Sequence, residues 1–170
     1  DSHTDLFHSY FDGTMFTHGT PFRRAIEENL LDPKRVIQIG IRGTQYDSED
    51  LDFANSVGIR VIKIDEFFDR GIQDVMAEAR EIVGENETYV SYDIDFIDPA
   101  FAPGTGTPEV GGLTVPQALE IIRGCRGLNL VGVDLVEVAP IYDNSGLTSL
   151  TAANLVYEML CVLPGVSYRD

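Results

Sequence analysis

The first residues of the sequence combine carboxylate and imidazole side chains at alternating positions, in the motif Asp1-Ser2-His3-Thr4-Asp5. In an extended segment, alternate residues point to the same side, so we expect Asp1, His3 and Asp5 to converge. Carboxylate and imidazole ligands together suit a borderline divalent cation such as Mn²⁺, Zn²⁺ or Fe²⁺. A polar capping turn is the alternative, because Asp, Ser and Thr are common in turns and caps.

A second acidic motif, Asp93-Ile94-Asp95-Phe96-Ile97-Asp98-Pro99, follows an apolar run. We expect Asp93 and Asp95 to share one face at the end of a buried strand. Two like charges in such a place are costly unless a metal ion neutralises them or they share one proton. A solvent-facing, frayed strand end is the alternative. Asp98, just before Pro99, is expected to cap the following turn.

Together the two motifs offer four carboxylates and one imidazole, which is more than one metal ion with an open position needs. They suit a pair of ions roughly 3.5–4 Å apart, bridged by carboxylates. His18 lies on a glycine-containing loop and suits proton transfer, although a loop histidine can also be a plain surface residue. Glu137 ends a predicted strand and could bind a cationic substrate; a salt bridge is the alternative.

Short β-branched runs alternate with amphipathic stretches along the chain. Strands are expected at residues 36–40, 57–64, 88–95 and 128–138, and helices at 21–30, 48–56, 65–83, 115–123 and 147–163. Pro21 suits a first helical turn and Thr114 an N-cap. This alternation predicts an α/β protein with a parallel sheet covered on both faces, whose reactive loops gather at the carboxyl ends of the strands. The long loop at 98–112 is expected to be functional.

The charge balance excludes several classes of partner. The 170 residues contain 12 Lys and Arg against 28 Asp and Glu, a net charge of −16, which argues against binding to nucleic acid or to an anionic membrane surface. The surplus of acid either keeps the surface repulsive or binds cations. With 44% hydrophobic residues, residues 1–170 are expected to form a single domain, and no apolar run is long enough to cross a bilayer.

The cysteines indicate a cellular compartment, and the first residues indicate whether the sequence is part of a larger domain. Cys125 and Cys161 have no metal or redox spacing, so reduced thiols in the cytoplasm are expected. The sequence opens at Asp1 with a ligand-rich motif and no signal-like segment. Because termini tend to fray, we expect a piece of a larger domain. A mitochondrial location would need a transit peptide ahead of Asp1.

Four segments resemble motifs of the ureohydrolases, the arginase and agmatinase family. Residues 1–5 resemble the family's Asp-Ala-His-x-Asp motif, and residues 91–99 resemble its second metal motif. Residues 101–108 are similar to its glycine-rich loop, and residues 134–140 to its substrate-acid strand. The four motifs stand in the family's order and run nearly from end to end of the chain.

The resemblance implies a three-layer α/β/α fold around a mostly parallel sheet and hydrolysis of a guanidino group by a hydroxide that bridges two Mn²⁺ ions. By this resemblance Asp1 and Asp93 bridge both ions, Asp5 serves one ion, and His3 and Asp95 serve the other. His18 matches the proton-shuttling histidine and Glu137 the acid that pairs with the guanidinium, and Asp5 also accepts a hydrogen bond from the hydroxide.

Two positions depart from the family pattern. Ser2 replaces the usual alanine, a small change at a residue that is not a ligand. The family's Gly-Gly-Asp-His segment, which supplies a further histidine ligand, has no counterpart in the sequence. The resemblance therefore indicates that an N-terminal part of the domain is missing.

The resemblance also suggests a substrate. The aromatic stretch at 6–16 lacks the asparagine of arginases, which disfavours arginine. Residues 18–24 and 152–155 look agmatinase-like, so agmatine is the favoured substrate, with urea and putrescine as products. Guanidino acids such as 4-guanidinobutyrate or 3-guanidinopropionate are the alternative, in which Arg23 and Arg24 could bind the substrate carboxylate. Pairing of these arginines with Glu27 and Glu28 is the competing expectation. A second alternative is an inactive, truncated homologue with a binding role. The resemblance suggests a homo-oligomer.

Overall fold

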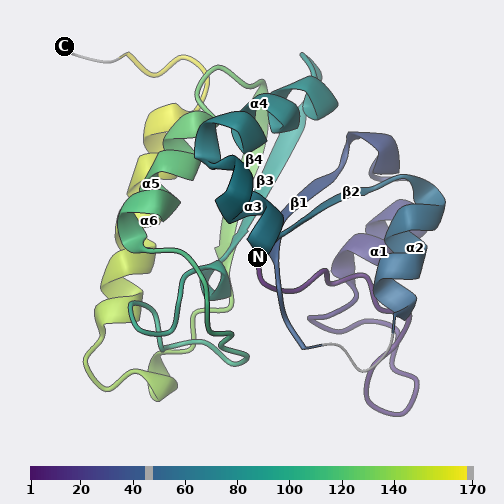
Figure 1. Ribbon diagram of the computed structural model, residues 1–170, viewed down its shortest axis with the longest axis horizontal. Helices are drawn as coiled ribbons and strands as arrows, with labels where there is room; N and C mark the ends of the chain where they lie inside the picture. Colours follow the sequence, from purple (N-terminus) through teal and green to yellow (C-terminus); the bar gives the residue numbers. More distant parts are fainter. Residues whose placement is uncertain (45–47, 168–170) are drawn as a thin grey trace.

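Helices and strands alternate along the chain, as Figure 1 shows for the computed structural model, which describes residues 1–44 and 48–167. The strands are β1 (Ile37–Ile41), β2 (Arg60–Lys63), β3 (Thr88–Asp93) and β4 (Leu130–Val136). The α-helices are α1 (Pro21–Glu27), α2 (Glu49–Val57), α3 (Ile64–Arg70), α4 (Ile72–Val83), α5 (Val115–Gly124) and α6 (Leu147–Val162). Three 3₁₀ turns complete the order: η1 (Pro33–Arg35), η2 (Ile94–Phe96) and η3 (Pro140–Tyr142).

The strands pair in parallel, as predicted, but they do so in two separate pairs. β1 pairs with β2, and β3 pairs with β4. The predicted fold class, α/β with parallel strands, is confirmed, although in the described part of the chain the two pairs are not joined into one continuous central sheet. An apolar groove with a cavity of about 320 Å³ separates them, lined by β1 on one side and β3 on the other, with Asp1 among its lining residues.

The helices pack around each strand pair. α6 lies against β4 and α5, and α4 contacts both α5 and β1. In Figure 1, α1 and α2 stand beside the β1–β2 pair, on the opposite side of the molecule from α5 and α6. The larger hydrophobic core lies under α3 to α6, and a smaller core of Leu6, Ile26, Ala54 and Ile59 lies under α1 and α2.

The predicted elements are confirmed, with shifts at their ends. β2 begins at Arg60 because α2 continues to Val57 and ends at a left-handed Gly58. The helix expected at 65–83 is two helices, α3 and α4, interrupted at Gly71. Thr114 forms the predicted N-cap, as part of a capping box with Gln117.

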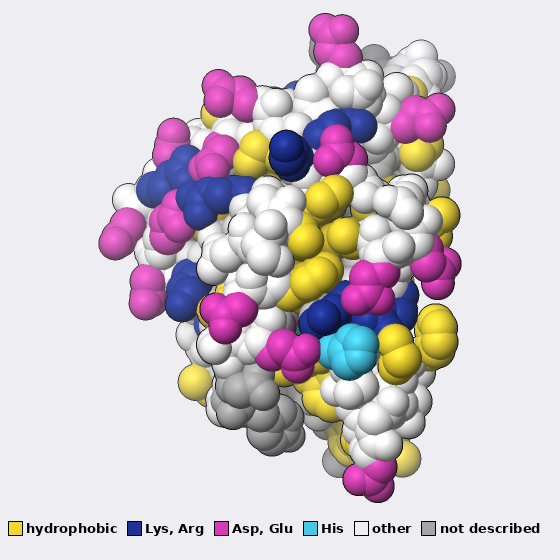
Figure 2. All heavy atoms as spheres, turned by 90° about the vertical axis from the view of Figure 1, so that its right-hand side faces the viewer, with side chains coloured by type: hydrophobic (Ala, Val, Ile, Leu, Met, Phe, Trp, Pro, Cys, Tyr) yellow, Lys and Arg dark blue, Asp and Glu magenta, His cyan; other side chains and the backbone are white. Residues whose placement is uncertain are grey.

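The surface carries many acidic side chains, which spread over the face shown in Figure 2 with Lys and Arg among them. Among the described residues, no helix combines the length and the apolar character needed to cross a membrane. Cys125 is buried and Cys161 is half-buried; reduced thiols at these positions stay a prediction.

A glycine in β1 links this strand to the second acidic motif. Gly40 has φ of +97°, and the register of β1 against β2 shifts between Ile39 and Ile41. A Cβ atom at Gly40 would lie 2.0 Å from the Phe96 ring. Because Phe96 belongs to the turn that carries Asp95, only glycine lets this turn pack against the end of β1.

We therefore expect Gly40→Ala to lower the free energy of unfolding by ~3 kcal/mol, since backbone strain and overlap with Phe96 add together. Gly146→Ala is the matched control, because Gly146 also has a positive φ of +71° but has open space around it. It should cost about 1 kcal/mol, from the strain alone. Urea denaturation of both variants measures the difference, and equal losses would show that the Phe96 contact has no energetic role.

Candidate metal centre

The first motif lies between the end of β1 and the turn that follows β3. The backbone N–H groups of Arg42 and Gly43 donate to the Ser2 carbonyl, at N···O distances of 3.0 and 2.8 Å. From the other side, the Ser2 N–H donates to Oδ1 of Asp95 at 3.0 Å. Ser2 is fully buried between these contacts. The motif is thus fixed where the carboxyl ends of β1 and β3 approach each other.

The second motif is placed by a turn as well as by a strand. Asp93 is the last residue of β3, and its Oδ1 accepts the backbone N–H of Asp95 at 2.8 Å. Asp95 lies in η2, so the expectation that both carboxylates share one face of a continuous strand is wrong. The alternative of a solvent-facing strand end is also wrong, because Asp93 and Asp95 are only 3% and 1% exposed.

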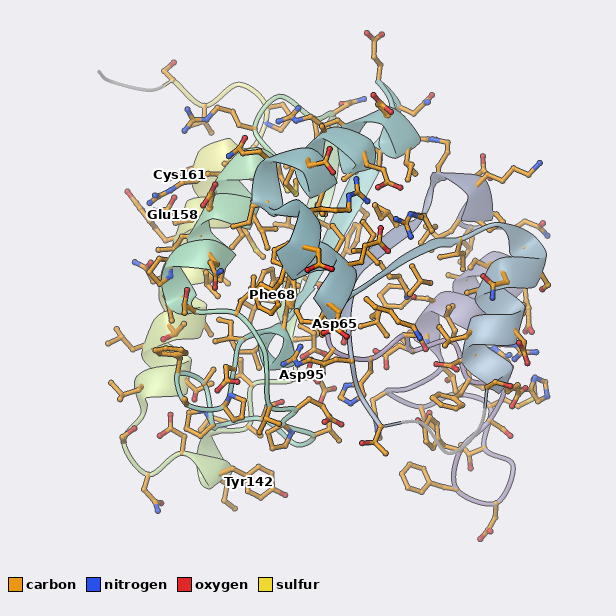
Figure 3. The ribbon with its side chains drawn as sticks, in the orientation of Figure 1. Asp65, Phe68, Asp95, Tyr142, Glu158 and Cys161 are labelled. Carbon is orange, nitrogen blue, oxygen red and sulfur yellow. The ribbon has the colours of Figure 1, made fainter. Side chains whose placement is uncertain are left out.

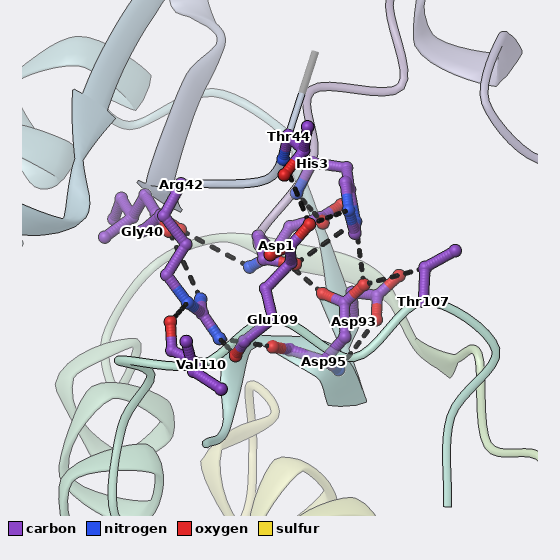
Figure 4. Close-up of polar contacts among 12 residues, drawn as sticks. Asp1, His3, Gly40, Arg42, Thr44, Asp93, Asp95, Thr107, Glu109 and Val110 are labelled. Carbon is purple, nitrogen blue, oxygen red and sulfur yellow. Dashed lines mark hydrogen bonds and ion pairs between the residues drawn. The ribbon is translucent and has the colours of Figure 1, made fainter. Parts of the chain in front are cut away.

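All five residues predicted as metal ligands come together in one cluster. The ligand atoms of Asp1, His3 and Asp95 lie within 4.8 Å of one another, and those of Asp1, Asp5 and Asp93 do the same. Figure 3 places Asp95 in the interior of the molecule, and Figure 4 shows Asp1, His3 and Asp93 close to it. Asp1 belongs to both groups, which suits a carboxylate shared between two sites.

The extended geometry expected for the first motif holds only in part. Asp5 has φ of +53°, in the left-handed region. Its side chain therefore joins the cluster through a local backbone turn and not through simple strand alternation. Such a conformation costs about 1–3 kcal/mol for a residue other than glycine and tends to occur at functional sites.

Burial changes the protonation of the cluster. Burial, together with the charge of Asp95, raises the pKa of Asp93 to about 8. Burial also raises the pKa of Asp5 to about 7. For Asp95 the cost of burial is outweighed, because hydrogen bonds from His3 and from the Ser2 N–H lower its pKa. Without a metal ion, the cluster therefore keeps protons near neutral pH that free aspartates would release.

The residues present fit a pair of divalent cations. Among the ion pairs of the described residues, these four carboxylates have no Lys or Arg partner, and His3 pairs with Asp95 at 2.8 Å. Four buried or half-buried carboxylates with so little positive charge are unfavourable unless a cation joins them. Oxygen ligands with one imidazole suit a borderline ion such as Mn²⁺. The resemblance implies that Asp93, like Asp1, bridges both ions. Because Asp93 belongs to only one of the two ligand groups, its bridging role stays a prediction.

Glu137 lies close to this cluster, after the end of β4. Its charge is among the causes that raise the pKa of Asp5. Its Oε2 atom lies 3.9 Å from the position that a Cβ of Gly106 would occupy, so it faces the glycine-rich loop. Glu137 has φ of +63°, which is uncommon for a glutamate. No ion pair of Glu137 is formed within the described residues, so the salt-bridge alternative has no support.

His18 lies on the loop before α1 and is exposed. Its ring stacks on Tyr10, with centroids 5.9 Å apart, and contacts Phe11 at 6.0 Å. The N–H of Phe7 donates to the Gly19 carbonyl at 3.2 Å, which ties this loop back to the first motif. The role of His18 as a proton carrier stays a prediction.

The other residues singled out from the sequence have structural roles. Asp98 caps its turn as predicted, accepting from the N–H groups of Ala100, Gly111 and Gly112. Arg23 pairs with Glu27 and Glu49, each at 3.0 Å, and Arg24 pairs with Glu27 at 2.8 Å. The competing expectation of pairing within the helix is thus confirmed with Glu27.

Sequence reasoning missed the residues that surround the cluster. Glu109 accepts the Thr44 N–H at 3.0 Å, and its Oε1 lies 3.7 Å from Nε2 of His3. Arg42 donates to the backbone carbonyl of Asp95 at 2.8 Å. Only their positions in the sequence could have indicated these two residues. Arg42 directly follows β1, and Glu109 lies in the long loop that was expected to be functional.

The raised pKa values predict how stability responds to pH and metal. In the metal-free protein, Asp93 and Asp5 bind protons more tightly when folded than when unfolded, where their pKa is ~4. The free energy of unfolding should therefore fall as the pH rises from about 5 to about 8. Saturating Mn²⁺ should remove this fall, because the ions replace the protons. Urea denaturation in EDTA and in Mn²⁺ across this range measures both effects.

Two variants control this prediction. Asp93→Asn should reduce the pH dependence of the metal-free protein, whereas Asp74→Asn should leave it in place because Asp74 lies on α4, outside both ligand groups, where it pairs with Arg70. A pH dependence that is the same with and without Mn²⁺ would contradict the proposed cation site.

Comparison with known proteins agrees with this geometry. The Arginase family profile matches residues 1–161. Guanidinopropionase of Pseudomonas aeruginosa is 56% identical over 170 residues, covering 100% of this chain and 54% of that protein. The mitochondrial agmatinase of Gallus gallus is 55% identical over 166 residues, covering 98% of this chain and 48% of that protein.

Among solved structures, the proclavaminate amidino hydrolase of Streptomyces clavuligerus superposes with a TM-score of 0.89 at 45% identity. The match covers 94% of this chain and 53% of that one. The chain thus spans about half the length of the relatives that it matches. The profile match, the relatives' identity and the shared fold lead to one conclusion: the chain belongs to the arginase family, the ureohydrolases.

Proposed function

We propose that this chain forms part of a metal-dependent hydrolase that converts a guanidino compound to urea and an amine. The observation that carries the proposal is the pair of ligand groups that share Asp1. Relatives named guanidinopropionase and agmatinase support the reaction class. Asp1, His3, Asp5, Asp93 and Asp95 would hold two Mn²⁺ ions.

When bound, the two ions would supply an activated water and Lewis acidity at neutral pH. The overall reaction adds one water to a guanidinium, R–NH–C(NH₂)₂⁺, and yields urea and R–NH₃⁺, so atoms and charge balance. The guanidinium carbon is a poor electrophile, and orientation of the substrate is therefore an important part of the catalysis.

Three further roles, in substrate binding and proton transfer, would fall to Glu137, Asp5 and His18. Glu137 would accept hydrogen bonds from the guanidinium and hold its carbon near the cluster, an interaction between opposite charges in a half-buried position. Asp5 would accept a proton or hydrogen bond from the attacking water. His18, on its exposed loop, would deliver a proton to the departing amine.

Agmatine is the substrate that we favour. Arg23 pairs with Glu27 and Glu49, which weakens the case for this arginine as a binder of a substrate carboxylate. Arg24 pairs with Glu27 alone, and its guanidinium nitrogens are buried without a hydrogen-bond partner among the described residues. The aromatic rings of Phe7, Tyr10 and Phe11 line the loop before His18 and suit an aliphatic chain. A guanidino acid is the second candidate, because guanidinopropionase and guanidinobutyrase are among the relatives.

An inactive homologue with a binding role is the third candidate. His18 and Glu137 would then have no reason to accompany the metal ligands, yet both are present. The strained backbone of Glu137 also favours a catalytic role, since such conformations tend to occur where function requires them.

Urea release by the complete protein tests the proposed reaction. With Mn²⁺, agmatine should yield urea faster than 4-guanidinobutyrate, and arginine should be the poorest substrate of the three. Asp93→Asn should lower turnover at least ~100-fold and lower the bound Mn²⁺, because loss of even an indirect ligand partner costs about 10–100-fold. The Asp74→Asn control, at an exposed position on α4 outside both ligand groups, should retain both. Absence of urea from every guanidine in the presence of Mn²⁺ would contradict the proposal.

Glu137→Gln tests the binding of the guanidinium. The amide keeps the shape of the side chain but loses its charge, which is worth about 1.5–3 kcal/mol in a hydrogen bond to a charged group. We expect kcat/KM for agmatine to fall by ~10–150-fold while the Mn²⁺ content stays at the wild-type level. Unchanged kcat/KM would remove Glu137 from the proposed mechanism.

A further inference from the structure

Arg42 holds the backbone beside the ligand cluster through an unusual set of contacts. Nη2 donates to the carbonyls of Asp95 and Glu109, both at 2.8 Å, and Nε donates to the Val110 carbonyl at 3.2 Å. Nη1 also approaches the Gly40 carbonyl at 3.4 Å. Figure 4 shows this guanidinium surrounded by carbonyls from β1, η2 and the long loop. One side chain thus joins three segments that are far apart in the sequence.

The hydrogen-bond acceptors of Arg42 are neutral backbone carbonyls. Its half-buried guanidinium forms no ion pair with a carboxylate among the described residues, although the charges of Asp95, Asp98 and Glu109 also act on it. The planar guanidinium presents several N–H groups in fixed directions, so it constrains its acceptors in a way that a lysine ammonium does not.

The loop held by Arg42 touches two residues of the cluster. Thr107 Oγ1 lies 3.5 Å from Oδ2 of Asp95, and Glu109 Oε1 lies 3.7 Å from Nε2 of His3. Oδ2 of Asp95 also contacts Nδ1 of His3 at 2.8 Å. Loss of the Arg42 contacts would therefore free the surroundings of both His3 and Asp95.

Gly112 provides the space that the Arg42 guanidinium occupies. A Cβ at Gly112 would lie 2.4 Å from Nη2 of Arg42 and 2.7 Å from the Phe96 carbonyl. Any larger residue there would push the guanidinium away from the carbonyls of Asp95 and Glu109. The glycine of the loop and the arginine after β1 are thus fitted to each other.

We propose that Arg42 is a positioning residue that sets the geometry of the Asp1–His3–Asp95 ligand group by clamping the 105–112 loop and the Asp95 backbone together. This inference rests on the proposed metal site but not on the choice of substrate. Asp5 and Asp93 receive no hydrogen bond from the Arg42 guanidinium among the described residues, and Asp93 is linked to the clamped backbone only by accepting the Asp95 N–H, so the Asp1–Asp5–Asp93 group should respond less to the loss of Arg42.

Titration of the metal-free complete protein with Mn²⁺, followed by calorimetry and by electron paramagnetic resonance, tests this proposal without relying on activity. For Arg42→Ala we expect one Mn²⁺ site to weaken by ~10–100-fold, as for loss of other indirect ligand partners, while the other changes less than about threefold. Arg42→Lys keeps the positive charge but lacks the planar set of N–H donors. Its Mn²⁺ affinity at the affected site should therefore stay at least about fivefold weaker than that of the wild type.

Arg35→Ala is the matched control. Arg35 is also half-buried and also donates to backbone carbonyls, those of Val83 and Glu87, but it lies away from the cluster. Both Mn²⁺ affinities of Arg35→Ala should stay within about twofold of wild type, which separates positioning from general destabilisation.

The outcomes distinguish failure of this inference from failure of the proposed function. A wild-type protein that binds no Mn²⁺ would overturn both. A wild type with two sites, together with an Arg42→Ala protein whose affinities are unchanged or fall equally at both sites, would overturn the positioning role alone. Full recovery by Arg42→Lys would assign the effect to charge and would also overturn it. If Arg42→Ala does not fold, Arg42→Lys gives the decisive comparison.

Discussion

The concentration of negative charge inside the fold is the constraint on which the rest of this structure depends. Asp93 and Asp95 are almost completely buried, and Asp1 and Asp5 lie against them. A folded protein tolerates such a cluster only when protons, histidine or metal ions offset the charge. The raised pKa values of Asp93 and Asp5 show that protons would do so in the absence of metal. The fold thus holds four mutually repelling carboxylates together, and a bound cation would relieve this repulsion.

The architecture explains why the charges meet at that point. The β1–β2 pair with α1 and α2 forms one side of the molecule, and β3 and β4 with α5 and α6 form the other (Figure 1). Ser2 is hydrogen-bonded to both sides, through residues 42–43 and through Asp95. Phe96 packs into the bulge at Gly40, and Arg42 joins the same two sides. The cluster therefore lies at the seam of the fold, where metal binding and the packing of the two sides are coupled.

Much of this arrangement could be predicted from the sequence because it rests on local patterns. Period-two and helical patterns indicated the order of elements. Alternating carboxylate and imidazole residues in the first motif, and acidic residues after an apolar run in the second, indicated the ligands. The two-pair arrangement of the strands could not be predicted, since apolar runs do not say which strands are neighbours. The left-handed backbones of Asp5 and Glu137 could not be predicted either, because positive φ is uncommon for any residue other than glycine, even though aspartate adopts it more often than most. Arg42 was missed for a related reason: its partners are backbone carbonyls, which carry no sequence signature.

Anomalous diffraction at the manganese edge, from crystals of the complete protein, would show directly whether two cations share the ligands of this cluster. We expect two anomalous peaks roughly 3.5–4 Å apart, both in contact with the Asp1 carboxylate. One peak should lie beside His3 and Asp95, and the other beside Asp5 and Asp93. No peak at the cluster, or peaks that leave Asp1 and Asp93 without a metal contact, would contradict this expectation.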